Sequence, residues 1–103
     1  MNFFIIPNMT RKNSFSVTNS LLNKLEELNC GVFFETEQKK YFGDRKNIIY
    51  NDDSEYKKSA DMFISVGGDG SFINAAKIAT IYHKPLIWVN AGKLAYMACI
   101  EGD

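Results

Sequence analysis

The feature that most constrains the fold of this chain is the apolar segment 62–66, which runs without a break into the glycine-rich loop 67–71 (Gly-Gly-Asp-Gly-Ser). A short apolar run that ends at turn residues is typical of a buried strand. The next stretch, 72–82, is apolar or alanine except for one polar stripe, so it predicts a helix that packs on a sheet. The sequence therefore predicts a strand, a glycine-rich loop and a helix in direct succession.

Three further apolar runs, 3–6, 32–34 and 85–89, also predict strands, because each is short and is bounded by polar or turn residues. The polar segment 35–53 predicts a long loop with a short extended piece at its Ile-Ile-Tyr stretch, 48–50. A short helix is expected at 55–60.

A helix is also expected between the first two strands. Leucine and valine side chains recur there at helical spacing from Val17 to Leu28, while most polar residues lie on the other face. Asn13 or Ser14 is the expected amino-terminal cap. Gly31 stands where a left-handed residue that ends a helix is expected.

This alternation of strands and helices predicts an α/β fold, a three-layer open parallel sheet with flanking helices. The length of 103 residues corresponds to a single domain. Three strand ends, 7–8, 67–70 and 90–92, then lie along one edge of the sheet. Because ligands of open α/β sheets bind at that edge, we expect the functional site there.

The carboxyl-terminal segment is unusual for a domain. Residues 96–100 are apolar, yet the sequence supplies nothing after them for them to pack against. We therefore expect residues 1–103 to be one domain of a longer protein.

Composition excludes several classes of function. Twelve basic and twelve acidic side chains give a net charge of zero, and the basic pairs, such as Arg11-Lys12, are too short to form a patch for nucleic acid. No apolar stretch is long enough to span a membrane. Cys30 and Cys99 lie far apart without metal-ligand spacing, which predicts no metal site and indicates reduced thiols in the cytoplasm, with a single disulfide as the open alternative.

The glycine-rich loop combines backbone access with one carboxylate. Its glycines allow backbone amides to approach an anion, and the start of a helix adds partial positive charge. The spacing fits neither the dinucleotide-binding G-x-G-x-x-G pattern nor the Walker A pattern. Asp69 could take a proton from a sugar hydroxyl or help to hold a divalent metal through water. Equally, Asp69-Gly70 could be a simple turn that caps the helix at Ser71.

At these residues the chain resembles the NAD kinases. Their amino-terminal domain carries Gly-Gly-Asp-Gly-Thr/Ser after a buried strand, matched here by 67–71. One strand later the family has Asn-x-Gly-x-Leu-Gly-Phe, matched by 90–96 with Ala95 for glycine and Tyr96 for phenylalanine. Lipid kinases and phosphofructokinases share the first motif, but their second motifs differ from this one.

The resemblance implies roles for particular residues. Asp69 would be the general base that activates the adenosine 2′-hydroxyl of NAD. Asp69, Gly70, Asn74 and Tyr96 would contact NAD, although many family members have a basic residue where Asn74 stands. The nucleotide loop would consist of six residues: Gly67, Gly68, Gly70, Ser71, Asn90 and Gly92.

The resemblance also implies the partners of the reaction. ATP with a divalent metal such as Mg²⁺, or polyphosphate in some members, would donate the phosphoryl group. The full-length protein would be a homo-oligomer with an all-β carboxyl-terminal domain that this chain lacks, so the chain alone should be inactive. Two other functions remain open: a non-catalytic nucleotide-binding module, and a lipid or sugar kinase domain with the same glycine motif.

Overall fold

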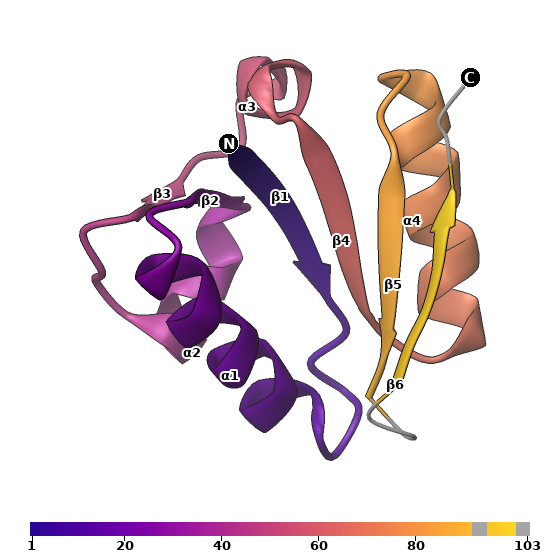
Figure 1. Cartoon of the computed structure of the whole chain (residues 1–103), viewed down its shortest axis with the longest axis horizontal. Coiled ribbons are helices and arrows are strands. Elements are labelled where there is room, and N and C mark those ends of the chain that lie inside the picture. Colours follow the sequence, from indigo (N-terminus) through magenta and orange to yellow (C-terminus); the bar gives the residue numbers. More distant parts are fainter. Residues whose placement is uncertain (92–94, 101–103) are drawn as a thin grey trace.

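The computed structural model describes residues 1–91 and the backbone of residues 95–100. It contains a six-stranded sheet with the order β3-β2-β1-β4-β5-β6 (Figure 1). Strands β1 to β5 are parallel, whereas β6 runs antiparallel to β5. The strands are β1 (Asn2–Pro7), β2 (Gly31–Phe34), β3 (Ile48–Tyr50), β4 (Met62–Gly67), β5 (Leu86–Asn90) and β6 (Ala95–Ile100).

Helices cover both faces of this sheet, which confirms the predicted three-layer α/β architecture (Figure 1). Leu22, Leu25 and Phe42 pack on one face, and Ala75 and Ala79 pack on the other. The helical elements are α1 (Ser14–Glu27), the 3₁₀ turn η1 (Thr36–Gln38), α2 (Lys39–Phe42), α3 (Ser54–Ser59) and α4 (Asp69–Ile81). None of the helices in the described part of the chain has the length and apolar character needed to cross a bilayer.

The two cores follow from the alternation of side chains along each strand. In β1, Phe3 and Ile5 point to the core beneath α1, while Phe4 points to the core beneath α4. In β4, Ile64 belongs to the first core and Phe63 to the second. Both central strands are buried on two faces, which explains why they read as continuous apolar runs.

Three expectations about elements need correction. Segment 35–53 contains η1 and α2 as well as the expected extended piece, which is β3. Gly31 does not end α1: it begins β2, and Asn29 takes the left-handed conformation instead, with φ 57°. Segment 96–100 does have a partner, because it pairs with β5 as most of β6.

The order of the strands creates a point at which the direction of winding reverses. From β1 the chain proceeds outward to β2 and β3, whereas β4 returns to the other side of β1 and leads to β5. The carboxyl ends of β1 and β4 therefore flank the switch point, where ligands of open α/β sheets bind.

Candidate functional site

Three strand ends meet at the switch point, as the sequence predicts. Pro7 is paired with Val66 across β1 and β4, and Gly67 is paired with Asn90 across β4 and β5. The backbone N–H of Asn8 donates to the Val66 carbonyl at 2.8 Å, which extends the pairing beyond the end of β1. Asn90, which is buried, therefore lies beside the glycine-rich loop.

Gly67 is a position that only glycine fits. Its φ is 155°, and a Cβ built on it would lie 2.8 Å from Ser71 Oγ and 3.0 Å from Asn8 Cβ. Its carbonyl also accepts a hydrogen bond of 3.1 Å from Trp88 Nε1. The first glycine of the motif thus lets the end of β1 and the first turn of α4 approach each other.

Asn8 connects these two elements directly. Its Nδ2 donates to Ser71 Oγ at 2.6 Å, and its Oδ1 accepts from the Thr10 hydroxyl at 2.6 Å and from the Thr10 backbone N–H at 3.1 Å. Both ends of the amide are occupied, so its orientation is fixed. Sequence reasoning found Asn8 only as a turn residue, because its partner Ser71 lies 63 positions away.

The first helical residue after the loop is Asp69, not Phe72 as expected. Gly68 is the amino-terminal cap residue, and its carbonyl accepts from the Phe72 N–H at 3.0 Å. The alternative in which Asp69-Gly70 is a turn before a cap at Ser71 is therefore wrong. Asp69 is exposed in the first turn of α4, where the partial positive charge of the helix favours a carboxylate.

Gly68 and Gly70 differ in how much free space surrounds them. A Cβ on Gly70 would meet no atom within 4 Å, so the first turn of α4 is open to a ligand there. A Cβ on Gly68 would instead collide with the Arg11 guanidinium. Arg11, which the sequence analysis noted only as part of a short basic pair, thus places a positive charge against the loop. No sequence pattern predicts this contact, because it depends on how the loop after β1 folds back toward the glycine-rich loop.

Two hollows flank the end of β1. One, of about 210 Å³, lies on the α4 side and is lined by Ile6, Pro7, Asn8, Ser71 and Asn74. The other, of about 300 Å³, lies toward α2 and shares Pro7 and Asn8 with the first. The structure therefore brings Asn74 together with Ser71 at the predicted edge.

Other predicted site residues are placed only in part. The backbone of Tyr96 is paired with Val89 in β5, next to Asn90, whereas Gly92 lies outside the described residues. Within the described part of the chain, no three His, Cys, Asp or Glu side chains come together as a metal site.

Comparison with known proteins agrees with this geometry. Residues 3–103 match the model of the ATP-NAD kinase N-terminal domain. The NAD kinase of Acetivibrio thermocellus is 30% identical over 97 residues, which cover 94% of this chain and 33% of that protein. The NAD kinase of Coxiella burnetii is 36% identical over 81 residues, covering 79% of this chain and 27% of that protein. The chain spans about a third of the length of the curated relatives it matches. It belongs to the NAD kinase family.

Proposed function

We propose that the protein containing this chain transfers a phosphoryl group to the adenosine 2′-hydroxyl of NAD, giving NADP. The observation that carries the proposal is the position of Asp69, exposed in the first turn of α4 at the switch point, beside the open backbone of Gly70. Membership of the NAD kinase family supports the choice of substrate.

In this mechanism Asp69 is the catalytic base. As the 2′-oxygen attacks the terminal phosphorus of the donor, the Asp69 carboxylate accepts the hydroxyl proton, and the bond from phosphorus to the leaving phosphate breaks. Backbone amides at the start of α4 and the Arg11 guanidinium would stabilise negative charge on the phosphoryl group. Mg²⁺ would enter as part of the ATP substrate and neutralise its phosphates.

The remaining residues would shape the nucleotide site. Asn74 lies in the hollow beside Ser71 and would offer its amide to NAD. The resemblance to the family also assigns Tyr96, Asn90 and Gly92 to the nucleotide site. We keep these four assignments as predictions, together with polyphosphate as an alternative donor.

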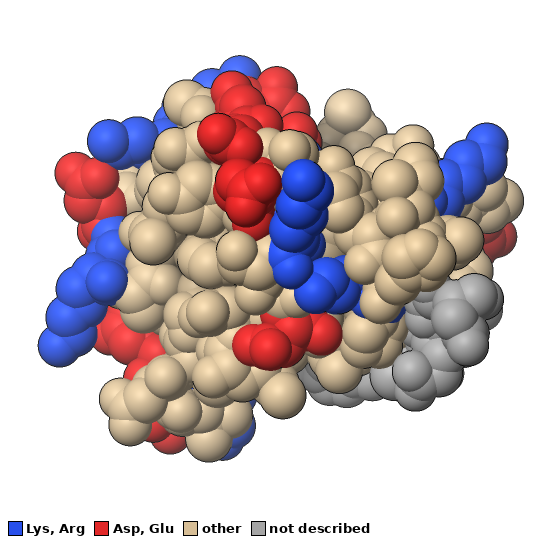
Figure 2. All heavy atoms as spheres, turned by 90° about the horizontal axis from the view of Figure 1, so that it is seen from above, with Lys and Arg blue, Asp and Glu red and all other residues tan. Residues whose placement is uncertain are grey.

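The setting of the reaction is also part of the proposal. We propose a cytoplasmic homo-oligomer whose partners are NAD and the phosphoryl donor rather than nucleic acid or membrane. Seen from the edge where β1 and β4 begin, acidic and basic side chains are interspersed, without a broad field of one sign on that face (Figure 2). This face lies opposite the carboxyl strand ends that form the candidate site, so the choice of a small-molecule substrate over a polyanion rests instead on the net charge of zero, since a polyanion needs clustered basic side chains.

The Asp69→Asn variant tests the proposal. The assay uses a protein in which this chain is joined to the carboxyl-terminal domain expected of the family. Loss of a general base should lower NADP formation by about 10²- to 10⁴-fold while circular dichroism shows an unchanged fold. An unchanged rate would refute Asp69 as the base, whereas a lack of NADP formation by the unsubstituted protein would favour a non-catalytic nucleotide module. Phosphorylation of diacylglycerol or a sugar phosphate in place of NAD would favour the wider kinase group.

A further inference from the structure

The position of Asp69 is set by its backbone rather than by contacts of its side chain. Asp69 lies between Gly68 and Gly70, which have no side chains to restrict the loop. Among the residues that the structure describes, none bonds to the Asp69 carboxylate. A general base acts only when it lies within hydrogen-bond reach of the proton that it accepts. Contacts from outside the glycine-rich loop must therefore hold the first turn of α4 in place.

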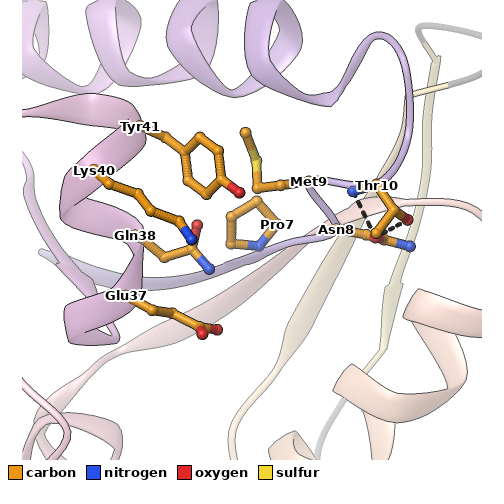
Figure 3. A pocket seen from close by; sticks show the side chains of 8 residues that line it. All are labelled: Pro7, Asn8, Met9, Thr10, Glu37, Gln38, Lys40 and Tyr41. Carbon is orange, nitrogen blue, oxygen red and sulfur yellow. Dashed lines mark hydrogen bonds between the residues drawn. The ribbon is translucent and has the colours of Figure 1, made fainter.

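The first of these contacts comes from the end of β1. Asn8 Nδ2 donates to Ser71 Oγ at 2.6 Å, and this bond connects the first turn of α4 to β1. The Asn8 amide is held in this orientation because its Oδ1 accepts two hydrogen bonds from Thr10 (Figure 3). The backbone of Asn8 is also fixed, since its N–H donates to the Val66 carbonyl of β4. Asn8 is therefore a rigid support for Ser71.

The second contact comes from Trp88 in β5. The Gly67 carbonyl accepts hydrogen bonds from Trp88 Nε1 at 3.1 Å and from the backbone N–H of Ala91 at 3.2 Å. Two donors on one carbonyl fix the peptide plane that joins Gly67 to Gly68. The Trp88 ring also stacks on Phe72 in the first turn of α4, with ring centroids 4.8 Å apart and planes 24° apart. Trp88 thus contacts the chain both before and after Asp69.

The two contacts reach the glycine-rich loop from opposite sides. The loop follows β4, and β4 lies between β1 and β5 in the sheet (Figure 1). Asn8 approaches the loop from the β1 side and Trp88 from the β5 side. Neither side chain fills the space beside Gly70, where an added Cβ would meet no atom within 4 Å. The first turn of α4 is therefore held on two sides and open to a substrate on another.

We infer that Asn8 and Trp88 are positioning residues for the phosphoryl transfer, an inference that rests on the proposed function. Asn8 acts through Ser71, and Trp88 acts through Gly67 and Phe72. Together they hold the Asp69 carboxylate where it meets the hydroxyl group of the substrate. Displacing a reacting group by about 1 Å can lower a rate by about 100-fold. Loss of either contact should therefore lower kcat while the KM for NAD stays nearly constant.

The test is steady-state kinetics of NADP formation in the protein that joins this chain to the carboxyl-terminal domain. Asn8→Ala should lower kcat by about 10- to 100-fold, with the KM for NAD within about twofold of the unsubstituted protein. Trp88→Phe keeps an aromatic ring on Phe72 but removes the N–H donor, so it should lower kcat by about three- to tenfold. Because Trp88→Phe is a mild change, it tests the inference even if Asn8→Ala fails to fold.

Further variants separate positioning from a general loss of stability. Asn23→Ala is the matched control, because it removes a side-chain hydrogen bond to Arg45 that is remote from the glycine-rich loop, and it should leave kcat unchanged. Asn8→Ala and Ser71→Ala remove the same bond, so the double variant should have about the kcat of Asn8→Ala alone. Ser71→Thr keeps the hydroxyl group and should retain kcat within about threefold.

Hydrogen exchange of the 103-residue chain gives a readout that does not depend on activity. The Phe72 N–H donates to the Gly68 carbonyl at 3.0 Å and closes the first turn of α4. Its exchange with solvent should become faster in Asn8→Ala, because the turn loses its bond to β1. The Tyr82 N–H, at the other end of α4, should exchange at an unchanged rate. An unchanged rate at Phe72 would contradict the inference.

The kinetic outcomes distinguish this inference from the proposed function. If Asp69→Asn abolishes activity while Asn8→Ala and Trp88→Phe keep the full kcat, the positioning role is rejected and the base remains. A raised KM for NAD with unchanged kcat would also reject it, since the two side chains would then bind substrate. An equal loss of kcat in Asn23→Ala would assign the effect to stability alone. Full activity of Asp69→Asn would reject the base and the positioning role together.

Discussion

Gly67 and Gly70, the first and last glycines of the glycine-rich loop, should respond in opposite ways to the same substitution. Gly67→Ala places a methyl group 2.8 Å from Ser71 Oγ, 2.9 Å from Ser71 Cβ and 3.0 Å from Asn8 Cβ, at a φ of 155°. Gly70→Ala places it in open space, within a helix and without positive φ. The pair therefore isolates the effect of the local packing from the effect of losing a glycine.

The magnitude for Gly67→Ala has two parts. Strain from the unusual backbone conformation costs about 1–3 kcal/mol, and crowding of a packed site costs about 1–3 kcal/mol. Asn8 and Ser71 can relieve part of the crowding only by breaking their 2.6 Å hydrogen bond. We therefore expect Gly67→Ala to lower the free energy of unfolding by about 2–6 kcal/mol. Gly70→Ala should leave it unchanged or raise it by about 0.5 kcal/mol.

Urea unfolding of the chain, followed by fluorescence, measures both variants. Trp88 is the only tryptophan, and it is a local reporter because its Nε1 donates to the Gly67 carbonyl and its ring stacks on Phe72 at 4.8 Å. Circular dichroism provides a second probe that is independent of this contact. Equal stability of Gly67→Ala and the wild-type chain would refute the reasoning, as would an equal loss in both variants.

Two further substitutions and one activity assay test the same structure. Asn8→Ala removes the hydrogen bonds to Ser71 and Thr10, so the free energy of unfolding should fall by about 1–3 kcal/mol. The backbone amide of Thr10 should also exchange its hydrogen faster with solvent, and an unchanged exchange rate would contradict this prediction. Burial raises the pKa of Tyr50 above 10.0, with a further rise from Asp44 and an opposing effect of Arg45. The folded chain therefore holds this proton more tightly, so stability should fall as pH rises above about 10, and Tyr50→Phe should lessen the fall in urea titrations at pH 9 to 11. The purified chain should form no NADP from NAD and ATP, and clear turnover in a coupled NADP assay would reject this expectation.

Much of the central sheet is predictable because its signals are local. The apolar runs that became β1, β4 and β5 are short and end at turn residues, so they predict strands of a parallel sheet. The grouping of Gly67 with Asn90 at one edge then follows from topology, and the structure confirms it. The outer elements were harder: the four residues of α2 lie in a polar segment with no helical period, and β6 depends on pairing with β5.

The candidate site was predictable in location but not in detail. The helix signal in the sequence begins at Phe72, because Asp69 and Gly70 are poor helix formers. The structure starts α4 three residues earlier, where a tertiary contact through Ser71 overrides that weak preference. Arg11 gave no local signal at all, since its importance lies in the glycine-rich loop that it approaches after folding.

The position of Asp69 depends on residues that need not touch a substrate. Because Gly67 has no side chain, Asn8 can approach Ser71 and bond to it across the strand end. That bond holds the first turn of α4 against β1, and the first turn presents Asp69 at the switch point. Substituting Gly67 or Asn8 should therefore displace the carboxylate without changing its chemistry. The glycine that opens the motif contributes to the site by permitting this contact, whereas Gly70 contributes by leaving space for a ligand.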